Sequence, residues 1–408
     1  MTCIIAVIPD FCNTPVMTRK HNLLRSADMR IHNQKIILSK IYDQRDRGIS
    51  QSELVSGTGL RAPTLFRIFS SLEEQGLIEV FQNPDENDSA KRGRRPVAFT
   101  TKKDALYTVG LEFWVSYISI GIFNFRGDRV FSKVQPLRKD IDISQTVESI
   151  VLLVRQALCG LNIPLEKVPG IGVAAPGQVD IENGTVINYG RIGGMQNYPL
   201  AAELEKHLGI PVIIHNNCSA MALSEYRYGG YDHKGAMFTL LLRSGVGGAF
   251  VDEQGVYTSE FKTLEPGHMS INYDGPSCYC GSKGCLQAYL LELDRDYYEQ
   301  GDKLLFNALE KKLLVHDGEA EKTTKQAARY LFVAMKNIMR LFSPRSFLIL
   351  GNGELVTRSI AENIKGYWVH EKDVFAGGGA PLIFSNTCSP LSSQQGASDL
   401  VIASYFSV

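Results

Sequence analysis

The chain carries a dense group of metal-binding side chains beyond its midpoint. Cys278, Cys280 and Cys285 fall within eight residues, and His268 lies shortly before them. Three thiolates and one imidazole satisfy a tetrahedral Zn²⁺ site. Because protein groups fill all four positions, no position remains for a catalytic water, and the pattern predicts a structural zinc ion. The alternative is a reduced cysteine loop that holds no metal.

Three glycine-bearing turns follow segments that resemble strands. They span residues 174–177, 243–248 and 350–353. Such turns bring backbone N–H groups close to phosphates or sugar hydroxyls. None of the three identifies a ligand by itself.

A different chemistry is indicated near the N-terminus, where residues 61–75 have the apolar spacing of a helix. The stripe expected to be buried consists of Leu65, Ile68, Phe69 and Leu72. The opposite face presents Arg61, Ala62, Thr64 and Arg67. A helix of this kind fits the major groove of DNA, where arginine can pair with guanine. Phe66 is a large ring on the same helix, and it either touches a thymine methyl group or packs on a neighbouring helix.

The elements around this helix complete a recognisable unit. A helix is expected over 30–42, and a short one begins at Ser50, where Ser50 and Glu53 form a capping box. Strands are expected over 77–81 and near 97–100, joined by a basic loop that includes Arg94 and Arg95. Arginines in such a loop can enter a narrow A·T-rich minor groove. The order predicts a winged helix-turn-helix. The alternatives are a solvated basic loop and a winged helix that binds protein.

From residue 107 onward, strand-like and helix-like segments alternate, which predicts two α/β lobes. We expect an N-terminal tail over 1–18 and the winged helix over 19–100. The smaller lobe should comprise 101–218 together with 391–408. The larger lobe, 219–390, should contain the zinc loop and the surface for self-association.

Composition excludes several classes of protein. The 408 residues include 43 Lys+Arg and 43 Asp+Glu, and 44% are hydrophobic, as in ordinary globular proteins. The early apolar run at residues 4–8 is too short for a signal sequence or a membrane span. We therefore expect a cytoplasmic protein with reduced cysteines. A small basic excess within residues 1–100 favours that end as the one that meets nucleic acid.

Four motifs together resemble the ROK family of repressors and sugar kinases. They are residues 170–177, the pair Asn216-Asn217, the segment Glu265-Pro266-Gly267-His268 and the cysteine loop. The resemblance runs from about residue 30 to the C-terminus. It implies a two-lobed, actin-like ATPase fold with a sugar pocket between the lobes. A winged helix in front matches the family's repressor branch, which includes glucose, xylose and N-acetylglucosamine repressors.

Two departures from the family's kinases concern catalysis. The kinases open the α/β core with an acidic residue and paired glycines that hold ATP phosphates, whereas bulky Phe113 and Trp114 follow Glu112 here. The kinases also use an aspartate as general base where this chain has Asn217. An amide cannot accept the proton of a sugar hydroxyl. We therefore expect no sugar phosphorylation.

The pocket itself is also altered. By resemblance, the sugar contacts would come from Gly177, Asn216, Asn217, Glu265 and His268. The family's glutamate after the last cysteine is Gln287 here, and a family asparagine aligns with Arg191. A gained cation and a lost anion favour a phosphorylated or acidic sugar over a neutral one. The alternative is that Arg191 forms a surface salt bridge.

Together these features predict a sugar-responsive transcriptional regulator, a repressor of carbohydrate uptake or catabolism genes with an inactive kinase-like domain. A homodimer or homotetramer, in contact through residues 220–341, would bind a pseudo-palindromic double-stranded operator. One alternative is a ROK sugar kinase that retains a winged helix. Another is a chain that mainly binds a protein of a sugar transport system.

Overall fold

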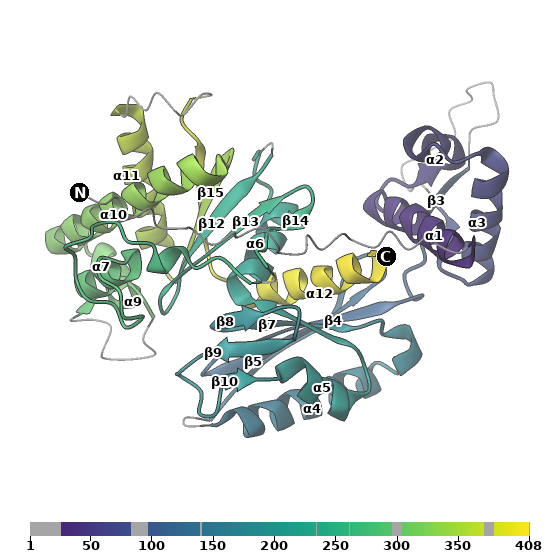
Figure 1. The fold of residues 1–408 in the computed structure, drawn as a ribbon, viewed down its shortest axis with the longest axis horizontal. Helices are drawn as coiled ribbons and strands as arrows, with labels where there is room; N and C mark the ends of the chain where they lie inside the picture. Colours follow the sequence, from purple (N-terminus) through teal and green to yellow (C-terminus); the bar gives the residue numbers. More distant parts are fainter. Residues whose placement is uncertain are drawn as a thin grey trace, which may run out of the picture.

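The computed structural model describes residues 26–82, 97–138, 141–233, 235–260, 262–295, 304–370 and 379–407. The described chain forms an N-terminal helical unit and two α/β lobes (Figure 1). None of the described helices combines the length and the apolar character that crossing a bilayer requires. The predicted tail, 1–18, lies outside the described residues.

The N-terminal unit consists of three helices and a small antiparallel sheet. Its elements are α1 (Ser26–Asp43), β1 (Ile49–Ser50), α2 (Gln51–Thr58), α3 (Ala62–Glu74), β2 (Ile78–Val80) and β3 (Ala98–Thr101), and the strand order is β1-β3-β2. The predicted capping box is present, because the Ser50 side chain accepts from the Glu53 amide while Glu53 Oε2 accepts from the Ser50 amide at 2.8 Å. The local signals in the sequence therefore place α2 and α3 correctly.

The core of this unit contains the four predicted α3 residues, which are all buried. They pack with apolar residues of α1 and β3, such as Ile41 and Phe99. The same core also takes in Phe125 and Ile402, which lie far away in the sequence. The ring of Phe406 lies 5.5 Å from that of Tyr42. The end of the chain thus completes the core of the N-terminal unit.

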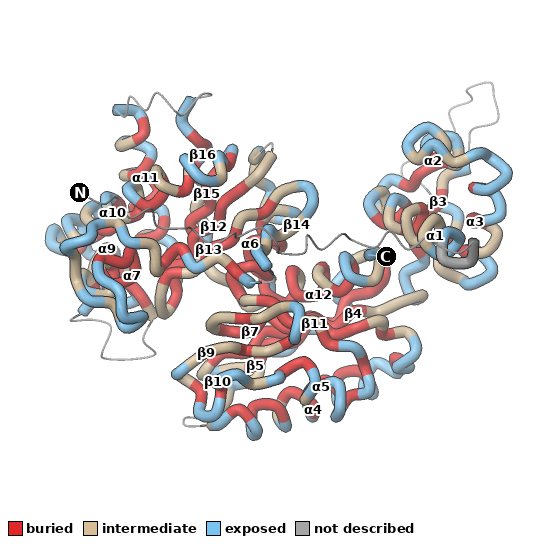
Figure 2. The backbone as a smooth tube through the Cα atoms, viewed as in Figure 1, coloured by how far each residue is buried: buried red, intermediate tan, exposed pale blue. Residues whose placement is uncertain are grey.

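The smaller lobe is built on a five-stranded sheet of order β11-β7-β4-β5-β6. Its strands are β4 (Tyr107–Phe113), β5 (Tyr117–Asn124), β6 (Arg129–Pro136), β7 (Ile171–Ala175) and β11 (Val212–Asn216). Helices α4 (Ile143–Gly160) and α5 (Leu200–Leu208) cover one face, and α12 (Pro390–Phe406) covers the other (Figures 1 and 2). The short helix η1 (Leu165–Lys167) connects α4 to β7, and a separate three-stranded sheet follows β7, formed by β8 (Gln178–Asp180), β9 (Thr185–Asn188) and β10 (Gln196–Tyr198).

Helix α12 approaches the sheet closely because glycines face it. A Cβ atom on Gly110 of β4 would collide with the carbonyl of Gln394, and one on Gly172 of β7 would collide with that of Ala397. Gly396 provides the same clearance against Ala220 on the neighbouring helix. These contacts fix α12 between the sheet and the larger lobe.

The larger lobe repeats the strand order of the smaller one, as β14-β13-β12-β15-β16. Its strands are β12 (Met237–Leu242), β13 (Val246–Asp252), β14 (Gly255–Val256), β15 (Ser346–Gly351) and β16 (Leu382–Thr387). Its helices are α6 (Asn217–Tyr228), η2 (Pro266–His268), α7 (Leu286–Leu293), α9 (Asn307–Leu313), α10 (Gly318–Phe342) and α11 (Glu354–His370). Two lobes with one topology are the architecture that the sequence predicts. The domain limits given above stay predictions.

Candidate metal centre, ligand cleft and nucleic-acid interface

The four predicted metal ligands converge at the start of α7. His268 ends η2, Cys278 and Cys280 lie in the following loop, and buried Cys285 precedes the first turn of α7. Isolated bridges from Ser270 to Cys285 and from Ser277 to Lys283 fold this loop back on itself. All four ligand atoms lie within 4.8 Å of one another. The fold of this loop therefore brings the four donors together at one point.

The distances between donors match a zinc tetrahedron. Two thiolates on one Zn²⁺, each at about 2.3 Å, lie about 3.8 Å apart, and a thiolate and an imidazole nitrogen lie about 3.6 Å apart. The Cys280 and Cys285 sulfurs are 3.7 Å apart. Cys278 Sγ and His268 Nδ1 are 3.5 Å apart. The donor set fits a structural zinc ion.

The glutamate three residues before the metal histidine lies on the same short turn. The His268 amide donates to the Glu265 carbonyl at 3.1 Å. Solvent reaches the Glu265 side chain, yet surrounding protein removes enough of its hydration to raise its pKa to about 7. On α7, Gln287 is 5% exposed, and its side-chain oxygen accepts from the Val246 amide at 2.9 Å. The structure thus places Glu265, His268 and Gln287 beside the glycine turn that opens β13.

The asparagine pair lies where β11 passes into α6. The Asn216 side chain accepts from the Cys218 amide and donates to the Gly177 carbonyl, each at 2.7 Å. Gly177 has φ +81°, a conformation that favours glycine. Both the oxygen and the nitrogen of the Asn216 side chain therefore bond to the backbone. Through these bonds Asn216 fixes the turn at Gly177 relative to the start of α6. Asn217 begins α6 and is 5% exposed.

A buried ion pair joins the two lobes. Arg243, at the end of β12, donates to Glu112 of β4 at 2.5 Å, and their side chains are 8% and 0% exposed. The Tyr117 hydroxyl donates to the other Glu112 oxygen at 2.8 Å and accepts from Arg243. Burial, together with the negative charge of Glu112, raises the pKa of Tyr117. Paired in this way, the three groups tolerate removal from water.

The tryptophan that departs from the kinase pattern covers this ion pair. The Arg243 guanidinium lies 4.2 Å from the centre of the Trp114 ring, a cation–π contact. Arg191 lies on the same ring at 5.8 Å, and Tyr189 packs against it at 5.7 Å. Sequence reasoning assigned no role to Arg243. The available signal was its position between an apolar strand and the glycine turn at residues 245–248. A cation at such a place is expected to be buried, and a buried cation requires a partner of opposite charge.

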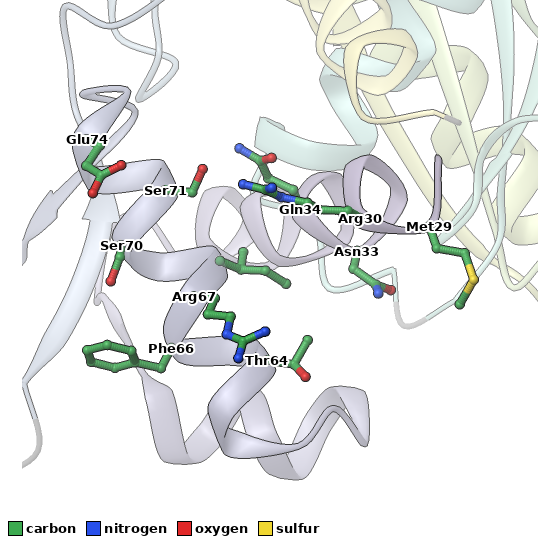
Figure 3. Close-up of a pocket in the computed structure, with 11 residues that line it drawn as sticks. Met29, Arg30, Asn33, Gln34, Thr64, Phe66, Arg67, Ser70, Ser71 and Glu74 are labelled. Atoms are coloured by element: carbon green, nitrogen blue, oxygen red, sulfur yellow. The ribbon is translucent and has the colours of Figure 1, made fainter. Parts of the chain in front are cut away.

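The predicted DNA-binding face of α3 is exposed. Arg61, Ala62, Thr64, Phe66 and Arg67 all reach solvent. Phe66 is 62% exposed, so it does not pack on a neighbouring helix. Thr64 and Arg67 border a hollow of about 570 Å³ between α1 and α3, together with Asn33 of α1 (Figure 3). Arg94 and Arg95 lie outside the described residues.

The sequence and the fold of this chain are similar to those of known repressors and kinases. The xylose repressor of Bacillus subtilis is 25% identical over 322 residues, covering 78% of this chain and 81% of the repressor. A solved ROK family transcriptional regulator, described as a homologue of the E. coli Mlc protein, superposes with a TM-score of 0.74 at 20% identity, over 92% of this chain and 97% of that one. A ROK hexokinase from Thermus thermophilus superposes with a TM-score of 0.59 at 24% identity, over 72% and 97%. The sequence model of the ROK family matches residues 110–374, and the chain belongs to this family.

Proposed function

We propose that the chain is a sugar-responsive, DNA-binding transcriptional repressor whose kinase-like cleft has no catalytic role. The observation that carries the proposal is the geometry of α3. Its apolar side is buried in the N-terminal unit, while Arg61, Thr64 and Arg67 project into solvent. A winged helix-turn-helix uses such a helix to read the major groove.

The extent of the structural likeness agrees with this reading. The superposition on the ROK regulator covers 92% of the chain, whereas that on the hexokinase covers 72%. The part of the chain covered by the regulator but not by the hexokinase is about as long as the N-terminal unit. This difference supports a likeness to the regulator that extends into the N-terminal unit.

The alternative, a sugar kinase that keeps a winged helix, conflicts with the cleft. Asn217 replaces the carboxylate that would accept the sugar's proton. Trp114 and the Arg243–Glu112 pair lie beside the glycine turn that a nucleotide phosphate would have to approach. A buried carboxylate already neutralises Arg243, so this cation is not available to a phosphate.

A continuous path of contacts connects the cleft to the N-terminal unit. Helix α6 begins at Asn217, and near its end Arg227 forms an ion pair with buried Asp399 of α12 at 3.0 Å. The last turns of α12 carry Ile402, which lies in the core of the N-terminal unit. A ligand that changes the angle between the lobes would shift the population of winged-helix orientations in a dimer.

We further propose that the effector is a phosphorylated or acidic sugar. Arg191 lies on Trp114 at the side of the cleft, and Gln287 adds no negative charge. Calorimetry with glucose 6-phosphate, D-glucose and D-xylose tests this preference. Tighter binding of a neutral sugar than of the phosphate would contradict it.

DNA binding is tested by incubating the full chain with fragmented genomic DNA of its source and sequencing the retained fragments. On a recovered fragment, Arg67→Ala should weaken binding about 5- to 150-fold, the effect of losing one base contact of about 1–3 kcal/mol. Lys206→Ala, an exposed cation on α5, is the matched control and should leave affinity unchanged. Affinity should fall steeply with salt. If no fragment is bound more tightly than random DNA, the proposal is wrong.

A further inference from the structure

One tyrosine in the cysteine loop turns back onto the metal histidine. Tyr279 stands between Cys278 and Cys280, and its side chain is largely exposed. Its hydroxyl nevertheless lies 3.1 Å from His268 Nε2. The two rings meet edge to face, with centroids 5.1 Å apart and planes at 87°. The contact is thus directed at one ring nitrogen.

The two nitrogens of His268 face different partners. Nδ1 lies 3.5 Å from Cys278 Sγ, on the side where the four donor atoms meet, and Nε2 faces the phenol. A histidine that binds a metal through Nδ1 carries its proton on Nε2. That N–H then donates to the Tyr279 oxygen. In metal sites, such outer partners fix the orientation and the tautomer of the ligand ring.

The same phenol also reaches the ligand cleft. Burial raises the pKa of this phenol, and the Gln287 side chain beside it opposes that shift. The other end of that amide accepts from the Val246 amide at the glycine turn. Tyr279 therefore connects the metal histidine with a residue of the expected sugar pocket. No motif of the sequence had singled it out.

We propose that Tyr279 is a positioning residue for the metal site, which holds His268 Nδ1 toward the ion by accepting a hydrogen bond from the Nε2–H group. While the phenol stays in place, it occupies the ring nitrogen through which His268 would otherwise contact a sugar. Ligand entry on that side therefore requires the phenol to move. The inference rests on the proposed zinc site and is independent of DNA binding.

The test is Zn²⁺ affinity of the full chain, measured by competition with a chromophoric chelator. Tyr279→Phe keeps the ring and removes only the hydroxyl, so a role in packing alone predicts no change. Loss of an outer-shell partner typically costs 10- to 100-fold in metal affinity, and the exposure of this site places the expected loss near tenfold. Tyr273→Phe, at a position 87% exposed just before the cysteines, is the matched control and should stay within twofold of the wild type.

A spectroscopic readout accompanies the affinity. In the zinc-loaded protein, the ¹⁵N resonance of His268 Nε2 should shift in Tyr279→Phe and stay in place in Tyr273→Phe. Equal affinities in the two variants would overturn the inference. A wild-type chain that binds no Zn²⁺ would overturn both the inference and the metal site, whereas the DNA-binding experiment would still decide the proposed function separately.

Discussion

The ion pair between the lobes should be one of the most sensitive points of the molecule. Glu112→Gln keeps the shape of the side chain but removes the charge opposite Arg243, which then remains buried at 8% exposure. Breaking a buried pair by removing one partner typically costs about 3–5 kcal/mol, because the remaining charge has lost its water and its counter-charge. The Tyr117 hydroxyl also loses its charged acceptor. We expect a loss of at least about 3 kcal/mol in the free energy of unfolding.

The assay is urea-induced unfolding followed by circular dichroism and by tryptophan fluorescence. Trp114 is 6% exposed and stacks on Arg243, so its fluorescence reports directly on the surroundings of the Glu112–Arg243 ion pair. In a Trp368→Phe background it is the remaining tryptophan of the two. The midpoint of the Glu112→Gln variant should drop, and Trp114 should become more accessible to quenchers.

Two comparisons make the result decisive. The double variant Glu112→Gln/Arg243→Gln removes both charges and should recover much of the loss, because no unpaired ion stays buried. Glu319→Gln breaks the exposed pair with Lys322 on α10 and should leave the midpoint unchanged. A Glu112→Gln protein as stable as the wild type, or a double variant less stable than the single one, would refute the reasoning.

Three further outcomes are expected. Cys280→Ser should lower Zn²⁺ affinity and loosen both ligand response and self-association, measured by chelator competition, by effector titration of DNA binding and by light scattering; normal induction would count against a role for the metal loop. Asn217→Asp should not restore phosphate transfer in a coupled ATPase assay with hexoses, because Trp114 and Arg243 remain in place, and steady turnover would show that the missing carboxylate was the sole defect. Burial raises the pKa of Asp294 to about 6, so the folded chain binds this proton more tightly than the unfolded chain and stability should fall as the pH rises from about 4 to 6; Asp294→Asn should flatten that dependence in unfolding curves at several pH values.

Local signals carried the parts of the fold that could be predicted. The α3 stripe, the capping box at Ser50 and the spacing of the metal ligands each depend on residues close in the sequence, and the structure shows all three. The pair Glu112–Arg243 depends on a contact across 131 positions and between two lobes. No periodicity or motif reports such a contact. Tyr279 was missed for a different reason, since an exposed loop residue gives no sign of where its side chain turns.

The core of the N-terminal unit includes residues from α12, and this affects how the chain can fold during translation. Ile402 and Phe406 are translated long after α1, yet they pack against it. During translation, the helices of the N-terminal unit therefore keep part of their apolar surface exposed until α12 has left the ribosome. A polypeptide that stops before α12 would therefore lack the helix that covers one face of the smaller lobe's sheet and the residues that complete the N-terminal core, so it should not reach the folded state described here.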